Sequence, residues 1–293
     1  MALKLPFLQV DVFTSSPFKG NPVAVVNCMG IDESLVSDQQ LQAIANWTNL
    51  SETTFLFKAT TDRCDYKLRI FTPTMELPFA GHPTIGSCKA FLQFTGQKNA
   101  KSLMQECQLG IVSLTISDEG KISFKAERAD VEEIPQDAID EYRKSLQIDC
   151  LAAPKLLQVG PAWVVYLAAD AESCYNANPD FAQMAATNTR YGHSGIILAG
   201  KKPGSSQDYE MRAFAPTDCV LEDPVCGSGS IALIRYLQDL HRFSETTNVS
   251  ITQGGRLKRQ GQIFCQIKAN GDGKFSYISE GNAIIVIEGS INI

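Results

Sequence analysis

Residues 71–87 read FTPTMELPFAGHPTIGS, and residues 214–230 read FAPTDCVLEDPVCGSGS. Both stretches contain Phe-x-Pro-Thr, then an acidic residue, then Pro-x-x-Gly before small residues that open an apolar segment. Gly81 and Gly227 are 146 positions apart, which is half of the 293-residue chain. This match favours an internal duplication over a chance similarity. It predicts two pseudo-symmetric domains with a cleft between them.

The two segments that follow the glycines are predicted to be central helices. PTIGSCKAFLQF begins at Pro83 and SGSIALIRYLQDL begins at Ser228, and both are apolar or small over most of their early turns. A helix of that composition is buried on most sides. We therefore expect a domain over 1–128 with its helix near 83–94 and a domain over 129–293 with its helix near 228–240. The last strand of the chain is the one segment that we expect could pack back on the first domain.

Segments rich in β-branched and aromatic residues outnumber the helical patterns. Strands are predicted, for example, over 7–13, 53–57 and 195–198. Besides the two buried helices, only 37–48 and 138–146 show helical periodicity. Many strands and few helices, without regular alternation, indicate an α+β fold in which each sheet wraps around its own helix.

The composition indicates a globular protein rather than a nucleic-acid-binding or membrane protein. Hydrophobic residues make up 44% and charged residues 20% of the chain, and the net charge is −6. A nucleic-acid surface would need a basic patch, and no apolar run reaches the roughly 18 residues of a membrane span. Pro6 interrupts the short apolar N-terminus, so no signal peptide is expected. The nine cysteines form no Cys-x-x-Cys pair, which favours the reducing cytoplasm and argues against disulfides and a zinc site.

The two glycine turns are candidate anion sites. A helix N-terminus leaves backbone N–H groups unpaired and carries partial positive charge, and glycine lets a ligand approach the backbone closely. The turns at Gly81 and at Gly227-Ser228 would together hold a small carboxylate. The alternative is that these glycines only permit tight helix packing. We favour the site because the turns form a matched pair beside ionisable residues.

Three ionisable residues near these turns are candidates for proton chemistry. His82, one of three histidines, directly follows Gly81 and is suited to proton transfer. Asp223 precedes Pro224 at the second turn, where it could also be a simple acidic residue at a helix start. Glu52, in WTNLSETTFLF, lies where a helix gives way to a strand, and an exposed turn glutamate is the alternative interpretation.

Two nucleotide-binding motifs match only in part. GSGSIA, from Gly227, fits a dinucleotide fingerprint, but the following VSITQGG lacks the acidic residue that would bind a ribose. GIILAGKK, from Gly195, has Lys202 where a phosphate loop needs Ser or Thr, and it is more typical of a strand and turn. Neither nucleotide function is favoured.

Four stretches resemble the signatures of the phenazine-biosynthesis-like isomerase family. They are GNPVAVV from Gly20, NLSETTF from Asn49, FTPTMELPFAGHPTIGS and EDPVCGSGS, and the similarity runs from QVDVFT to the end of the chain. The sequence also looks similar to fungal members of the family. The resemblance implies a diaminopimelate-epimerase-like fold, a homodimer, and no cofactor or metal. It also implies a small anionic carboxylate substrate.

The resemblance assigns roles to the candidate residues. The family's acid/base glutamate falls on Glu52, its histidine on His82 and its aspartate on Asp223. Its glycine and serine at the helix start fall on Gly227 and Ser228, and Gly81 is the matching substrate-binding glycine of the first turn. A single carboxyl group can remove a proton at one carbon and return it at another where water is kept out.

The thiol of Cys226 separates this chain from two-thiol racemases. Related racemases and epimerases carry one cysteine in each half, but Ala80 stands at the first position here. We therefore expect Cys226 to be a small residue at a helix entry. Two alternatives stay open: a one-thiol epimerase in which Cys226 pairs with Glu52 or His82, and a binding or regulatory protein without turnover.

Overall fold

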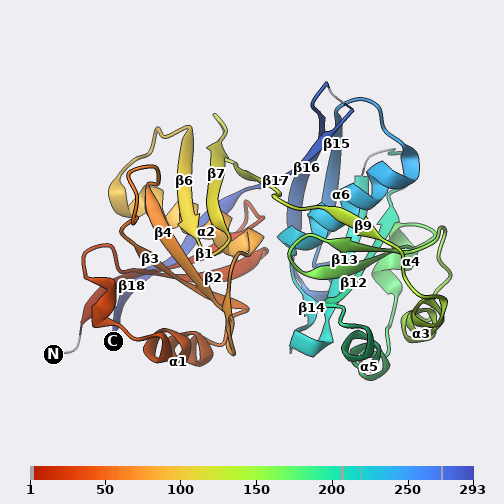
Figure 1. Ribbon diagram of the computed structural model, residues 1–293, viewed down its shortest axis with the longest axis horizontal. Helices are drawn as coiled ribbons and strands as arrows, with labels where there is room; N and C mark the ends of the chain where they lie inside the picture. The colour runs from red at the N-terminus through yellow and green to blue at the C-terminus, as the bar shows by residue number, and fades with distance from the viewer. Residues whose placement is uncertain (1–2, 206–207, 219, 272) are drawn as a thin grey trace. The chain divides into compact units, whose positions relative to one another are not determined.

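A computed structural model describes residues 3–205, 208–218, 220–271 and 273–293 of the chain (Figure 1). Its contacts divide the chain into two compact units, Met1–Lys125 with Glu280–Ile293, and Ala126–Ser279. The expected boundary lies at residues 128 and 129. The C-terminal segment from Glu280 belongs to the first unit, which is the arrangement we considered for the last strand.

The first unit is a mixed sheet with one helix on each face. Its strands are β1 (Lys4–Val12), β2 (Asn21–Asn27), β3 (Glu52–Phe57), β4 (Tyr66–Phe71), β5 (Glu76–Leu77), β6 (Ser102–Cys107), β7 (Gly110–Ile116), β8 (Ile122–Lys125) and β18 (Ala283–Asn292). Its helices are α1 (Asp38–Thr48) and α2 (Gly81–Thr95). Ser37 begins α1 with a capping box, in which its hydroxyl accepts from the Gln40 N–H while the Gln40 side chain accepts from the Ser37 N–H.

The second unit repeats this plan with additional helices. Its strands are β9 (Asp130–Glu132), β10 (Lys155–Gln158), β11 (Ala162–Leu167), β12 (Gly195–Lys201), β13 (Asp208–Ala215), β14 (Val220–Asp223), β15 (Thr247–Gln253), β16 (Gly261–Ala269) and β17 (Phe275–Gly281), the last of which runs into the first unit. Its helices are α3 (Gln136–Leu146), α4 (Ala171–Asn176), α5 (Phe181–Tyr191) and α6 (Gly227–His241).

Strand pairing confirms the predicted α+β fold and shows the same connectivity in both units. β2 is parallel to β3 as β11 is to β12, and β3–β4 and β12–β13 are both antiparallel. β4 pairs antiparallel with the short strand β5 and parallel with β6, the strand after the central helix. In the same way, β13 pairs antiparallel with the short strand β14 and parallel with β15. The two units are therefore copies of one topology.

The duplication extends to single residues. Phe71 pairs with Thr53 in the first unit, and Phe214 pairs with Ile196 in the second. Two residues before each phenylalanine stands an arginine, Arg69 or Arg212, which makes a bidentate ion pair with a glutamate on the short strand. The Nε and Nη2 donors lie 2.8 and 2.7 Å from Glu76, and 2.9 and 2.8 Å from Glu222. Each guanidinium also lies over its phenylalanine ring, 5.2 and 4.8 Å from the centroid.

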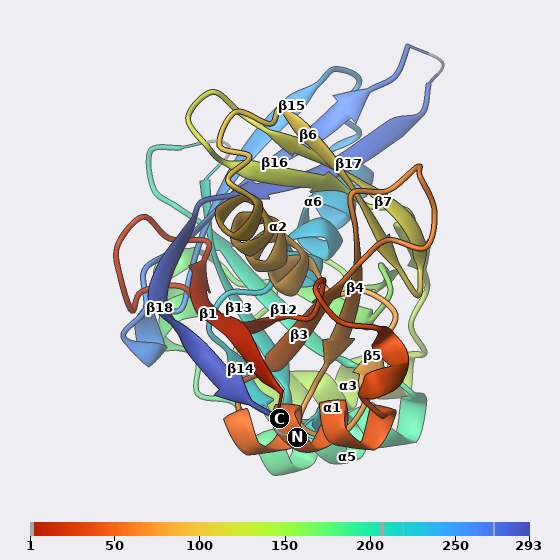
Figure 2. The same ribbon diagram turned by 90° about the vertical axis from the view of Figure 1, so that its left-hand side faces the viewer.

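In the first unit the sheet is covered on both faces. Figure 2 shows α2 crossing the sheet and β18 running alongside β1, with which it pairs antiparallel. α2 approaches closely, because a Cβ added to Gly86 would lie 2.3 Å from Val23 Cγ1. On the other face, α1 buries Leu41 and Ala45 against a cluster that includes Phe55. The central helix is thus buried as predicted, and ten of its residues are buried.

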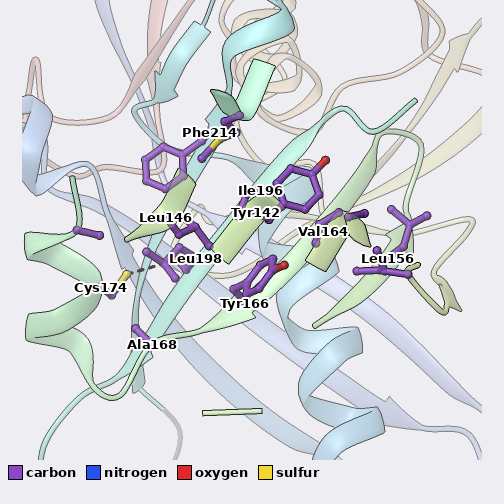
Figure 3. Close-up of a cluster of buried hydrophobic side chains, with 14 residues drawn as sticks. Tyr142, Leu146, Leu156, Val164, Tyr166, Ala168, Cys174, Ile196, Leu198 and Phe214 are labelled. Carbon is purple, nitrogen blue, oxygen red and sulfur yellow. Dashed lines mark hydrogen bonds between the residues drawn. The ribbon is translucent and has the colours of Figure 1, made fainter. Parts of the chain in front are cut away.

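The second unit has a cluster of buried apolar side chains under α3 and α5. Figure 3 shows aromatic Tyr142 and Tyr166 beside Leu146, Ile196 and Phe214, all of them buried. Because side chains alternate along a strand, Val164 and Tyr166 join this cluster while Trp163 and Val165 point to the opposite face, toward α6. A sheet that is buried on both faces explains the continuous apolar runs in β11 and β12.

Helices α4 and α5 were not predicted. α4 has only six residues, and α5 reads FAQMAATNTRY, in which small and polar residues outnumber apolar ones. The segment from Gly195 is strand β12, which confirms the strand interpretation over a phosphate loop. None of the helices in the described parts of the chain is long and apolar enough to cross a membrane.

Candidate active site

The first unit brings Glu52 and His82 into contact. Helix α1 ends at its left-handed C-cap Asn49, and Glu52, three residues later, is the first residue of β3. His82 is the second residue of α2. Oε2 of Glu52 lies 3.2 Å from Nε2 of His82, and both atoms are shielded from solvent. The side chains are 15% and 5% exposed, so the glutamate is not an exposed turn residue.

His82 is held as a neutral imidazole. Burial lowers its pKa from 6.5 to about 3, because a desolvated imidazolium is unfavourable. Its Nδ1 lies 3.3 Å from Nδ2 of Asn21, at the start of β2. The ring also contacts the Pro22 backbone, and its Nε2 contacts Oε2 of Glu52 without a hydrogen bond between the two atoms. The buried imidazole therefore lies against Glu52 without carrying a charge.

The start of α2 presents unused backbone donors next to this pair. Ala80 is the N-cap residue, and its methyl side chain makes no capping hydrogen bond. The Thr84 N–H is bound to the Ala80 carbonyl oxygen, and Pro83 has no N–H. Within the described residues, the N–H groups of Gly81 and His82 have no acceptor. The N-terminal turn of α2, with its helix dipole, is therefore a candidate anion site.

The second unit places Asp223 at the matching helix. Asp223 ends β14, and its Oδ1 accepts from the Val225 N–H at 3.0 Å. Burial raises the pKa of its carboxyl group to about 6. The amide of Gln253 joins this segment to the helix start, since Nε2 donates to the Asp223 carbonyl oxygen at 2.8 Å and Oε1 accepts from the Cys226 N–H at 2.9 Å.

Cys226 is the N-cap residue of α6, and its sulfur is occupied. Sγ accepts from the Gly229 N–H at 3.3 Å and lies 3.5 Å from the Ser228 hydroxyl. Burial and the nearby Asp223 raise the pKa of the thiol well above 9. A helix N-terminus can lower a thiol pKa, but desolvation dominates here. The sulfur therefore acts as a capping acceptor, which supports the interpretation of Cys226 as a small helix-entry residue.

Ser228 at the second turn has a partner that the sequence did not reveal. Nε1 of Trp163, on β11, donates to the Ser228 Oγ at 3.0 Å. Among the described residues, the N–H groups of Gly227 and Ser228 have no acceptor, as at the matching turn of α2. Both predicted glycines, Gly81 and Gly227, are the first residues of buried 15-residue helices, which confirms that part of the prediction.

Sequence reasoning missed Asn21, Trp163 and Gln253. Asn21 lies within the GNPVAVV stretch, so it could have been proposed from the resemblance. Trp163 and Gln253 lie in strands without a recognisable motif, and only folding brings them to α6. Arg69 and Arg212, which lie near the motifs, are engaged in the ion pairs described above. In the described part of the chain, no group of three or more His, Cys, Asp or Glu could hold a metal ion.

Solved structures of a PhzF-family protein and of an epimerase share this fold. A PhzF-family protein from Bacillus anthracis has a TM-score of 0.85 at 20% identity, over 99% of this chain and 100% of that chain. A hydroxyproline epimerase from Agrobacterium vitis has a TM-score of 0.66 at 13% identity, over 99% and 93% of the two chains. At these identities the similarity shows the fold alone, and it confirms the epimerase-like architecture.

The family model of phenazine biosynthesis-like proteins (PhzC-PhzF) matches residues 10–289. The chain therefore belongs to the phenazine biosynthesis-like family. "Antisense-enhancing sequence 1" of the fungus Schizosaccharomyces pombe is 37% identical over 97% of both chains. A trans-2,3-dihydro-3-hydroxyanthranilate isomerase of Pseudomonas chlororaphis is 28% identical over 97% of this chain and 98% of its own. These findings confirm the predicted family, the similarity to a fungal member and the isomerase class.

Proposed function

We propose that this protein is a cofactor-independent isomerase that moves a proton, and with it a double bond, within a small carboxylic acid. The observation that carries the proposal is the 3.2 Å contact between the Glu52 carboxyl group and a buried, neutral His82. Glu52 acts as the general base that removes the proton and as the general acid that returns it. Acid/base groups of this kind contribute about 10²–10⁴ in rate.

The first unit would supply the proton transfer. Removing a proton next to a carboxylate or a double bond leaves negative charge on the substrate. The N–H groups of Gly81 and His82 and the dipole of α2 would stabilise that charge. A neutral His82 keeps the Glu52 carboxylate free to accept the proton, whereas an imidazolium at 3.2 Å would weaken it as a base.

The second unit offers an anion site of the same kind. Gly227 and Ser228 offer backbone N–H groups and a hydroxyl for a carboxylate, at a helix N-terminus that favours anions. Asp223, with a pKa raised to about 6, would accept from or donate to a second polar group of the substrate. Relatives named trans-2,3-dihydro-3-hydroxyanthranilate isomerase support a cyclic amino acid or hydroxy acid as the substrate class. The cytoplasmic location and the homodimer remain predictions.

The one-thiol epimerase is disfavoured by the state of the sulfur. A thiolate base needs a lowered pKa, whereas burial and Asp223 raise that of Cys226 and its sulfur caps Gly229. A binding protein without turnover would have no use for the buried Glu52–His82 pair, because an unexploited carboxyl group there only incurs the free-energy penalty of desolvation.

The proposal is tested by proton exchange in heavy water. Wild type and Glu52→Gln are incubated with trans-2,3-dihydro-3-hydroxyanthranilate and with simple cyclic amino acids and hydroxy acids, and deuterium incorporation is followed by NMR. We expect exchange with wild type and a loss of at least about 10² in rate for Glu52→Gln. Glu119→Gln is the control, since its side chain is 74% exposed. A Glu52→Gln protein that exchanges at the wild-type rate would refute the mechanism.

A further inference from the structure

The two repeats differ at the positions that correspond to the acid/base pair. In the first unit, Glu52 directly precedes Thr53, which pairs with Phe71 of β4. Glu52 itself pairs with Val23 of β2. In the second unit, the equivalent residue is Gly195, which directly precedes Ile196, the partner of Phe214. Gly195 itself pairs with Trp163 of β11. The position of His82, second in the central helix, is held by Ser228.

The second unit has no room for a carboxyl group at the glutamate position. A Cβ added to Gly195 would lie 2.0 Å from the Phe214 carbonyl oxygen and 2.7 Å from Cζ3 of Trp163. The indole of Trp163 thus occupies the space next to the helix that a side chain would otherwise fill. It is 4% exposed and reaches the first turn of α6 through its N–H group.

The hydrogen bond from Trp163 determines which way the Ser228 hydroxyl is polarised. An indole N–H can only donate, so the Ser228 oxygen must accept at 3.0 Å. The serine proton is then directed away from Trp163. Its other neighbour is the Cys226 sulfur at 3.5 Å, and a thiol sulfur is a weak hydrogen-bond acceptor. An oxyanion would replace that sulfur readily as the acceptor.

We propose that Trp163 is a positioning residue that presents the Ser228 hydroxyl as a hydrogen-bond donor to the substrate carboxylate. This inference rests on the proposed function, in which α6 binds the carboxylate. The chain of bonds would run from the indole N–H to the serine oxygen and from the serine proton to the carboxylate, and each bond strengthens the next. Where the first repeat has the acid/base pair Glu52 and His82, the second repeat has two hydrogen-bond donors, Trp163 and Ser228.

A double-mutant cycle tests whether Trp163 acts through Ser228. The probe is anthranilate (2-aminobenzoate), a planar carboxylate, and its dissociation constant is measured by calorimetry. The variants are Trp163→Phe, which keeps a buried ring without the N–H, Ser228→Ala, and the double variant. We expect each single variant to bind about tenfold more weakly, as for loss of a bond to a charged group, and the double variant to bind no more weakly than Ser228→Ala. Trp47→Phe is the control, because Trp47 is 80% exposed.

Two results of the cycle would overturn the proposal. One is wild-type affinity in Trp163→Phe. The other is a double variant weakened by the product of the two single effects, because independent contributions multiply. In Trp163→Phe we also expect a raised KM with kcat retained for any substrate found by proton exchange, since a purely structural defect would lower the active fraction instead.

A second measurement needs no variant that could misfold. The chain has two tryptophans, so a ¹⁵N–¹H spectrum shows two indole signals. On titration with anthranilate we expect the Trp163 signal to move and the Trp47 signal to stay; a Trp163 signal that does not move at millimolar anthranilate would refute the proposal. Glu52→Gln should keep this shift while losing exchange. Retained exchange with an intact shift would refute the proposed mechanism but leave the role of Trp163 standing.

Discussion

Ala80 and Cys226 are equivalent residues, the N-caps of the two 15-residue helices α2 and α6. The alanine leaves the first turn of α2 uncapped by a side chain, whereas the cysteine sulfur accepts from the Gly229 N–H. The difference bears on mechanism, because a two-thiol racemase would need a cysteine at both positions.

We predict that the Cys226 thiol is dispensable for catalysis. Cys226→Ala should lose under tenfold in exchange rate, because the sulfur only caps a helix, and this is less than the low end of about 10² for a general acid or base. The loss of exchange rate in Glu52→Gln, measured in the same assay, is the reference for this comparison. Equal losses in the two variants would promote the one-thiol epimerase. Because burial raises the pKa of this thiol, we also expect it to resist alkylation in the native protein.

His82 should remain uncharged down to mildly acidic pH. Burial lowers its pKa to about 3, so its ¹⁵N chemical shifts should be those of a neutral ring from pH 8 to pH 5. His241, at the C-terminal end of α6, is the internal comparison. A folded pKa below the unfolded value of 6.5 also means that this group destabilises the folded state progressively as pH falls below 6.5. A His82 resonance that titrates near pH 6.5 would contradict the assignment.

Asp223 should lower the stability of the protein as pH rises. Its folded pKa of about 6 lies above the ordinary aspartate pKa of 3.8, so the folded state binds more protons than the unfolded state between these values. Its contribution to stability is therefore full below pH 3.8 and is lost as pH rises through 6. Asp223→Asn should remove this component from the free energy of unfolding, measured in urea at pH 4 to 7. If the free energy of unfolding changed with pH to the same extent in wild type and in Asp223→Asn, the raised pKa of Asp223 would be contradicted.

The two equivalent ion pairs should differ in their effect on stability. Arg212 and Glu222 are 5% and 8% exposed, whereas Arg69 and Glu76 are 13% and 27% exposed. Arg212 also donates to the carbonyl oxygens of Tyr175 and Ala177. Arg212→Met should cost about 3–5 kcal/mol of unfolding free energy, because it leaves a buried carboxylate without its partner.

Arg69→Met is the matched control for that experiment. Its carboxylate partners Glu76, Glu33 and Asp38 are 27%, 32% and 81% exposed, so solvent screens them and Arg69→Met should cost less than Arg212→Met. A second control is Arg212→Met with Glu222→Met, which should recover part of the loss because no buried charge remains. Equal destabilisation by Arg212→Met and Arg69→Met would contradict the argument from burial.

Much of the architecture could be predicted from local sequence. The repeated Phe-x-Pro-Thr and Pro-x-x-Gly stretches identified the duplication, and the apolar character of the segments after Gly81 and Gly227 identified two buried helices. These signals are local, because helix burial and turn chemistry are written in consecutive residues. Helices α4 and α5 escaped prediction because they are short or weakly amphipathic, so tertiary packing rather than periodicity stabilises them.

The sequence by itself determined the family, the duplication, and the loss of one racemase thiol at Ala80. Only the tertiary structure decided that Glu52 contacts His82, that Trp163 donates to Ser228, and that the Cys226 pKa is raised rather than lowered. The reason is physical: strand register brings residues from distant segments to the same helix end, and burial changes a pKa through the whole surrounding volume. Neither effect is encoded in any short stretch of the chain.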